Sequence, residues 1–188
     1  MFCLSKIEQT LSLSPQLLDL PLVNAIKGEV EKMFLDKVIP NLGLCISIYD
    51  IHAINGGFII PGEGSPTYEV IFRLIMFRPF VGEILSGNIL ESTNDGLRLS
   101  LGFFHDIYVP VSQLPQPCKR RDDGIWLWDY NSYEFTMDLN EEVLFEVLSI
   151  NYPPVPVKQD ANSKQFAPMV VVGRMQGDGL GVISWWED

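Results

Sequence analysis

Cysteine is scarce in this chain of 188 residues, and its three cysteines do not form a recognisable set. Cys3, Cys45 and Cys118 are an odd number and contain no C-x-x-C pair. Cys45 lies within an apolar segment, which is typical of a structural thiol in a reducing compartment. A disulfide framework and a zinc site are therefore disfavoured, and we expect an intracellular protein without a metal or other cofactor.

Long apolar runs and a leader segment are also missing. The longest apolar stretches are interrupted by Arg73, Arg78 or glycine well before the ~20 residues that a membrane span needs. The first ten residues show no basic segment followed by an apolar one, so we expect no signal peptide. With 47% apolar and 20% charged residues, the chain can form a packed core. These features predict a soluble protein that makes no membrane contact.

Positive charge is in short supply. There are 13 Lys and Arg residues against 24 Asp and Glu, which gives a net charge of −11. Affinity for nucleic acid comes mainly from Lys and Arg contacts to phosphates. The basic cluster Lys119-Arg120-Arg121 is followed at once by two aspartates, so we interpret it as a solvated loop, with a phosphate contact as the alternative. If the protein touches nucleic acid, we expect another molecule to hold it there.

Motifs for catalysis are absent from the sequence. His52 and His105 are the two histidines, and the side chains of the adjacent pair His105-Asp106 would diverge on a strand. The glycine-rich segment 177–181 lacks both the Lys-Ser/Thr ending of a phosphate loop and the strand-to-helix context of a dinucleotide site. We therefore expect a protein that is not an enzyme.

Apolar spacing predicts a helix packed on an antiparallel sheet in the first part of the chain. The helix is expected over about 22–36, with Pro21 able to stand at its first position. In the segment 68–77, apolar residues fall on both faces, which suits a strand buried on both sides or one crossing an interface. Other extended segments are expected at 2–13, 42–51 and 58–60, with Asn55-Gly56-Gly57 as a turn and 61–66 as a loop.

Phe77-Arg78-Pro79-Phe80 then breaks the pattern. Proline donates no backbone hydrogen bond and biases Arg78 toward an extended conformation. We interpret this segment as a stiff joint between domains 1–79 and 80–188. Beyond it, a loop is expected at 119–124, a surface excursion at 152–166, and short strands at 81–91, 96–104, 106–110, 125–137, 142–150 and 168–175. These strands predict an oligonucleotide/oligosaccharide-binding (OB) barrel.

The tryptophans of the second domain have two interpretations. Trp126 and Trp128 lie two apart on an expected strand, so they could stack on a ligand or belong to the core of the barrel or of an interface. Near the end of the chain, the glycines at 177–181 allow a tight turn. We expect the tryptophans that follow the turn, Trp185 and Trp186, to pack the terminal segment back onto the body.

Four segments give the chain a resemblance to a known family: NLGLCISIYDI (41–51), FIIPGEGSPTYEVIFRLIMFRPFVGEI (58–84), LRLSLGFFHDIYVP (97–110) and GLGVISWW (179–186). Together they resemble the stalk subunit of multisubunit RNA polymerases, of which archaea have one version and each nuclear polymerase has a counterpart. The last two segments are most similar to the RNA polymerase III version. The resemblance covers nearly the whole chain and is weakest at 111–140 and 151–166. It implies an α+β N-terminal domain, with a helix on an antiparallel sheet, followed by an all-β S1-type OB barrel.

The resemblance also implies a function. Members are non-catalytic subunits that form an obligate heterodimer with a small helical partner and dock on the polymerase core. For the RNA polymerase III version, the resemblance implies a location in the nucleus and a role in initiation at small-RNA genes. The joint, Phe77-Arg78-Pro79-Phe80, would lie near the partner. The docking loop of the N-terminal tip domain is most similar to Pro61, Gly62, Glu63, Gly64 and Ser65, although an ordinary hairpin turn would explain the same residues.

An RNA-contacting face is implied only in part. RNA-binding S1 domains usually carry an aromatic after the glycine of the second strand and a histidine after the third, where this chain has Leu97 and 108–110. Leucine offers no stacking face. Because neighbours on a strand point to opposite faces, at least one of two adjacent phenylalanines is expected in the core. The candidate RNA contacts are Arg98, Phe103, Phe104, His105, Tyr108, Lys119, Arg120 and Arg121.

Two alternatives stay open. The chain could be an independent S1-domain RNA-binding protein, or the equivalent stalk subunit of another nuclear RNA polymerase. The acidic balance and the missing aromatic favour the polymerase III stalk, with weak single-stranded RNA contact at most.

Overall fold

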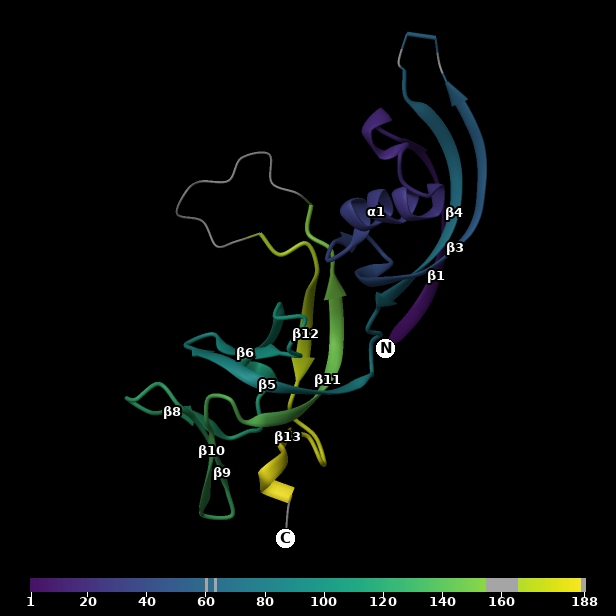
Figure 1. Cartoon of the computed structure of the whole chain (residues 1–188). Helices are drawn as coiled ribbons and strands as arrows, with labels where there is room; N and C mark the ends of the chain where they lie inside the picture. The colour runs from purple at the N-terminus through teal and green to yellow at the C-terminus, as the bar shows by residue number, and fades with distance from the viewer. Residues whose placement is uncertain (60, 63, 155–165, 187–188) are drawn as a thin grey trace. The chain divides into compact units, whose positions relative to one another are not determined.

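The computed structural model describes residues 1–59, 61–62, 64–154 and 166–186, and its elements fall into two units, Met1–Arg78 and Pro79–Asp188 (Figure 1). Most of the regular structure is β-strand. The predicted fold class, an α+β unit followed by an all-β OB barrel, is confirmed.

The first unit is built on an antiparallel sheet with the strand order β1-β4-β3-β2. The central strand β4 (Pro66–Phe77) pairs along its whole length with β1 (Phe2–Ser12) and β3 (Gly43–Ile59). β1 lies at one edge, as predicted, and the short β2 (Val38–Ile39) lies at the other. The backbone N–H and C=O groups along the central strand can therefore find partners on both neighbouring strands.

The helix α1 (Leu22–Phe34) covers the concave face of this sheet (Figure 1). It follows a short 3₁₀ turn, η1 (Pro15–Leu17). Its buried residues Ala25, Ile26 and Val30 share a core with alternate residues of β4: Val70, Phe72, Leu74 and Met76. Burial of each large apolar side chain contributes about 1.5–3 kcal/mol, so this shared core stabilises the unit by several kcal/mol.

Two predictions about these elements need correction. Pro21 precedes the helix instead of forming its first residue, and its carbonyl accepts hydrogen bonds from Asn24 and Ala25. The segment 68–77 was predicted to be a strand buried on both sides or one crossing an interface. Within this unit it is fully buried on one face only, so the first alternative is wrong and the second stays a prediction. Ile71 and Ile75, on its other face, are half-buried, because the helix covers a single side of the sheet.

The predicted turn at Asn55-Gly56-Gly57 is wrong. β3 continues through these residues, and its register against β4 shifts between Gly56 and Phe58, which marks a β-bulge. Gly56 and Gly57 have φ values of 99° and 94°, a positive-φ conformation that glycine adopts readily and that one type of bulge uses. The same dipeptide is suited to a turn or to a bulge, and the pairing with β4 selects the bulge.

In the second unit, five strands close into a barrel in the order β12-β7-β6-β5-β11, and β11 pairs back to β12. The strands are β5 (Ile84–Thr93), β6 (Gly96–Ser100), β7 (Ile107–Pro110), β11 (Glu142–Asn151) and β12 (Val170–Arg174). The β7–β12 pairing is parallel and the others are antiparallel. Alternate residues fill the interior, among them Ile89, Leu97, Leu99, Ile107, Val109, Phe145 and Val171.

A separate three-stranded sheet, β10-β9-β8, lies in the sequence between β7 and β11. The predicted strand 125–137 is in fact a hairpin of β9 (Trp126–Tyr130) and β10 (Tyr133–Met137), joined by Asn131 and Ser132. The predicted loop 119–124 begins instead within β8 (Cys118–Arg120), which pairs with β9. Both turn residues of the hairpin have positive φ, which suits a tight two-residue connection.

The remaining elements are short. η2 (Val111–Gln113) follows β7, and β13 (Gly181–Val182) pairs with β11 before η3 (Ile183–Trp186). The predicted strand 96–104 ends at Ser100. Of the predicted surface excursion 152–166, residues 155–165 lie outside the described part of the chain.

Candidate docking and nucleic-acid-binding surfaces

Large apolar side chains are exposed at the tip of the β3–β4 hairpin. Phe58 is 77% exposed and Ile59 is 62% exposed. They precede the predicted docking loop, in which Gly62 and Gly64 have φ values of 96° and 66°. Pro61 is exposed and Ser65 is half-buried, whereas Glu63 and Ile60 lie outside the described residues. The loop is a hairpin connection, and the paired apolar side chains beside it are typical of a protein-binding surface.

The body of this hairpin is held by a charged pair between opposite residues. Arg73 donates from Nε to Oδ1 of Asp50 at 2.8 Å, and from Nη2 to the second carboxylate oxygen. The guanidinium also lies over the ring of Tyr49, 4.8 Å from its centroid. This hydrogen-bonded guanidinium lowers the pKa of Asp50 below its ordinary value. The ion pair thus links β3 and β4, the two strands of the hairpin that carries the apolar tip.

The segment predicted as a joint is anchored within each unit. Phe77 is buried and packs on Phe2, with ring centroids 5.7 Å apart, and the Arg78 amide donates to the Met1 carbonyl at 2.9 Å. On the other side, the Phe80 amide donates to a Glu83 carboxylate oxygen at 3.1 Å. Of the four predicted junction residues, Arg78 and Phe80 are exposed, so these two can contact another protein.

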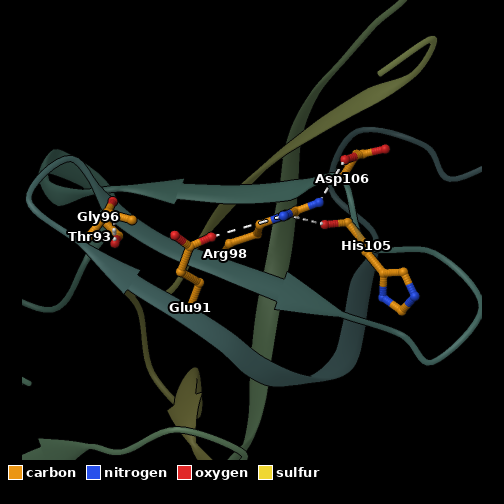
Figure 2. A network of polar contacts seen from close by, with 6 residues as sticks. All are labelled: Glu91, Thr93, Gly96, Arg98, His105 and Asp106. Atoms are coloured by element: carbon orange, nitrogen blue, oxygen red, sulfur yellow. Dashed lines mark hydrogen bonds and ion pairs between the residues drawn. The ribbon is translucent and has the colours of Figure 1, made fainter. Parts of the chain in front are cut away.

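On the outer face of the barrel, Arg98 is the centre of a polar network (Figure 2). Arg98 on β6 lies opposite Tyr108 on β7 and Glu91 on β5. Its Nε donates to the His105 carbonyl at 3.0 Å and its Nη2 to Asp106 Oδ1 at 3.2 Å. Its Nη1 is 3.9 Å from Oε2 of Glu91. The guanidinium lies 5.8 Å from the Tyr108 ring centroid. The Arg98 side chain therefore links β6 to its two neighbours, β5 and β7.

Of the aromatic and histidine candidates near this network, Phe103, Phe104 and His105 lie in the segment between β6 and β7, and Tyr108 lies on β7. Phe104 is buried and Phe103 is 46% exposed, so one of the pair is in the core, as expected, although both lie in a turn and not on a strand. The His105 ring points away from Arg98 in Figure 2, and its Nδ1 is 2.8 Å from the Ser100 hydroxyl. The exposed aromatic surface here is limited to Phe103 and part of Tyr108.

Internal partners also hold the basic cluster. Lys119 donates to Glu134 at 2.7 Å, and this hydrogen bond raises the pKa of Lys119 and lowers that of Glu134. Arg120 donates to the Asn94 side chain at 2.5 Å. Arg121 pairs with Asp123 at 2.9 Å. Any phosphate contact by these three side chains would have to compete with partners already in place.

The acidic balance is concentrated in the barrel unit. Residues 79–188 contain seven Lys and Arg against sixteen Asp and Glu, a net charge of −9 of the total −11. Such a unit repels phosphates over its surface as a whole. The geometry therefore supports at most an auxiliary RNA contact.

Sequence reasoning missed an aromatic cluster on the β9–β10 hairpin. The Trp128 ring centroid is 5.0 Å from that of Tyr130, 5.5 Å from Phe135 and 5.3 Å from Trp185. Trp126 is instead buried and donates its indole N–H to the Thr93 carbonyl at 3.0 Å. Trp185 does pack back onto the body, as predicted, whereas Trp186 is 50% exposed. In the sequence, the alternation of Trp128 and Tyr130 and the two tryptophans near the end of the chain could have indicated this cluster.

The described part of the chain contains neither a cluster of metal ligands nor a helix suited to crossing a membrane. No group of three or more His, Cys, Asp or Glu side chains among those residues could hold a metal ion. All three cysteines are free thiols, and burial raises the pKa of Cys45 and Cys118. None of the helices in the described ranges combines the length and apolarity that a bilayer crossing requires.

Comparison with known proteins relates both units to RNA polymerase subunits. The family model described as "RNA polymerase III subunit Rpc25" matches residues 83–186. A second, described as "SHS2 domain found in N terminus of Rpb7p/Rpc25p/MJ0397", matches residues 8–64.

Individual relatives align over the whole chain. DNA-directed RNA polymerase III subunit rpc8 of Schizosaccharomyces pombe is 33% identical over 203 residues, covering 100% of each chain. The Bos taurus subunit RPC8 is 34% identical over 201 residues, covering 99% of this chain and 98% of that protein. The Saccharomyces cerevisiae subunit RPC8 is 32% identical over 212 residues, covering 100% of both.

Proposed function

The chain belongs to the RNA polymerase III subunit Rpc25 family, and on that basis we propose that it is a non-catalytic stalk subunit of DNA-directed RNA polymerase III. The observation that carries this proposal is the end-to-end similarity to relatives named as subunits of that polymerase. In this role the protein acts in the nucleus and supports initiation at small-RNA genes.

We assign docking on the polymerase core to the first unit. The tip of the β3–β4 hairpin presents Phe58 and Ile59, two exposed apolar side chains next to a loop with glycines in the left-handed conformation. Exposed aromatic side chains that fill a pocket on a partner commonly provide most of the binding energy of an interface. The glycines allow the loop backbone to approach the core closely.

We assign the heterodimer contact with a small helical partner to the segment that follows Pro79. Phe80, Val81 and Ile84 are 49%, 64% and 60% exposed, so three large apolar side chains occur within five residues of the chain. Burial of apolar surface of this kind drives association. The acidic barrel then leaves RNA contact in an auxiliary role, with Phe103 and Tyr108 as its aromatic contributors.

Affinity purification of a tagged copy from cells tests the proposal. The eluate should contain the large core subunits of RNA polymerase III together with a small partner. An eluate without polymerase core subunits would contradict the assigned function, and the core subunits of a different nuclear polymerase would redirect it.

Two variants test the docking surface separately. The double substitution Phe58→Ser and Ile59→Ser should reduce recovery of the core subunits while the small partner remains bound. Leu139→Ser is the matched control, because Leu139 is 55% exposed but belongs to the barrel unit. Equal recovery of the core with both variants would refute the role of the tip without touching the family assignment.

A further inference from the structure

An aromatic groove lies between the β9–β10 hairpin and η3, and the proposed function does not use it. It is a cavity of about 420 Å³ whose walls include Trp128, Tyr130 and Phe135 from the hairpin and Trp185 and Trp186 from η3. This volume lies within the ~300–1,000 Å³ typical of ligand pockets. The groove is open, since Tyr130 and Trp186 are 53% and 50% exposed.

The ring surfaces of the groove are available, but the indole donors of its two inner tryptophans are not. Trp128 Nε1 donates to the Gln116 carbonyl at 3.3 Å, and Trp185 Nε1 donates to the Thr136 carbonyl at 3.3 Å. These two bonds hold both rings in position. The groove therefore offers a ligand preorganised aromatic surface, which attracts cations through the negative face of each ring.

Charge among the described residues that line the groove has one sign. Among the described residues that line it, Asp178 is the only charged one, it is exposed, and it forms no hydrogen bond or ion pair with any other described residue. Arg174 on β12, four residues before Asp178 in the sequence, is paired with Glu146. With the barrel unit at a net charge of −9, a cationic ligand is attracted to this site and a phosphate is repelled.

We propose that this groove binds an arginine side chain of an extended basic segment of a partner protein. A guanidinium is planar, so it can stack on the tryptophan and tyrosine rings and at the same time donate two hydrogen bonds to the Asp178 carboxylate. A lysine ammonium is more strongly hydrated and lacks the planar face, so it fits less well. The inference goes beyond the polymerase assignment and does not depend on it.

Tryptophan fluorescence of the full chain provides the assay, because three of its four tryptophans line the groove. The probe is a blocked peptide with a single central arginine, and its control carries citrulline, a neutral isostere of arginine. The arginine peptide should change the emission saturably and bind at least about tenfold more tightly than the citrulline peptide, since only the guanidinium is charged.

Substitutions identify the site. Asp178→Asn should weaken the arginine peptide about fivefold, because it removes the charge of an exposed carboxylate and one of its two acceptor oxygens. The affinity of the uncharged citrulline peptide should change much less. Asp122→Asn is the matched control, as another exposed carboxylate outside the groove, and should change neither affinity. Trp186→Ala should weaken both peptides by removing stacking surface, with an unchanged circular dichroism spectrum.

Several outcomes would overturn the proposal. Equal affinity for the arginine and citrulline peptides, or no saturable change with either, would remove the basis for a cation site. Tighter binding of a proline-rich peptide without basic residues would assign the groove to polyproline recognition. Competition by an oligouridylate that binds more tightly than the arginine peptide would assign it to RNA.

Discussion

Substitution of Gly96 by alanine tests the close approach of strands β6 and β7 in the barrel most directly. Gly96 begins β6 and has a φ of 137°, and an added Cβ would lie 2.1 Å from the Val109 carbonyl oxygen of the neighbouring strand β7. Gly102 is the matched control, because its φ of 86° is also positive but no atom lies within 4 Å of the position of an added Cβ. The two substitutions therefore share backbone strain and differ in steric overlap.

The expected magnitudes follow from these two contributions. Placing a non-glycine residue in a disfavoured positive-φ conformation costs about 1–2 kcal/mol. Forcing additional atoms into a packed contact costs a further ~1–3 kcal/mol. The gain from reduced entropy of the unfolded chain applies to both variants and cancels in the comparison. We expect Gly96→Ala to lower the free energy of unfolding by about 2–5 kcal/mol, and Gly102→Ala by about 1–2 kcal/mol.

Urea denaturation followed by tryptophan fluorescence measures this difference. All four tryptophans lie in the barrel unit, so the signal reports unfolding of that unit. Free energies come from linear extrapolation of the transition to water. If the two variants unfold within about 0.5 kcal/mol of each other, which is the usual additivity error, the close approach of β6 and β7 at Gly96 is refuted.

Two further predictions concern the charged networks. Arg98→Leu should lower the free energy of unfolding of the barrel by about 1–2 kcal/mol, because it leaves Asp106 and the His105 carbonyl without their donor; an unchanged urea midpoint would contradict the bridging role. Asp50→Asn should destabilise the first unit at neutral pH, measured by circular dichroism during thermal unfolding. Because Arg73 lowers the pKa of Asp50 from 3.8, the difference between wild type and variant should vanish as pH falls below that value through the folded pKa, and a difference that persists there would contradict the linkage.

Periodicity predicted those elements whose burial is regular. The helix at 22–34 and the strand at 66–77 were expected within two residues of their ends, because alternate or helically spaced apolar side chains face one core. Positions where glycine or short polar residues interrupt a strand were predicted less well. Asn55-Gly56-Gly57 is a bulge where a turn was expected, and Asn131-Ser132 is a turn inside a segment expected as one strand.

The candidate RNA contacts show why a list of residue types is not a site. Lys119, Arg120 and Arg121 were named from their charge, but their availability depends on their partners. Two of those partners, Glu134 and Asn94, are 15 and 26 residues away in the sequence. Strand pairing brings these groups together, and no local pattern of the chain contains that information.

The amino-acid sequence by itself determined the acidic character of the protein, the two kinds of unit and the family, because these depend on composition, on local periodicity and on motifs that can be compared directly. Only the tertiary structure decided how those residues are used. It paired the basic side chains at 119–121 with partners in the same unit. It also exposed Phe58 and Ile59 at a hairpin tip and brought Trp128 next to Trp185, 57 positions further along the chain. The physical reason is that scarcity of a residue type is a property of composition, whereas the availability of the few that are present depends on long-range contacts.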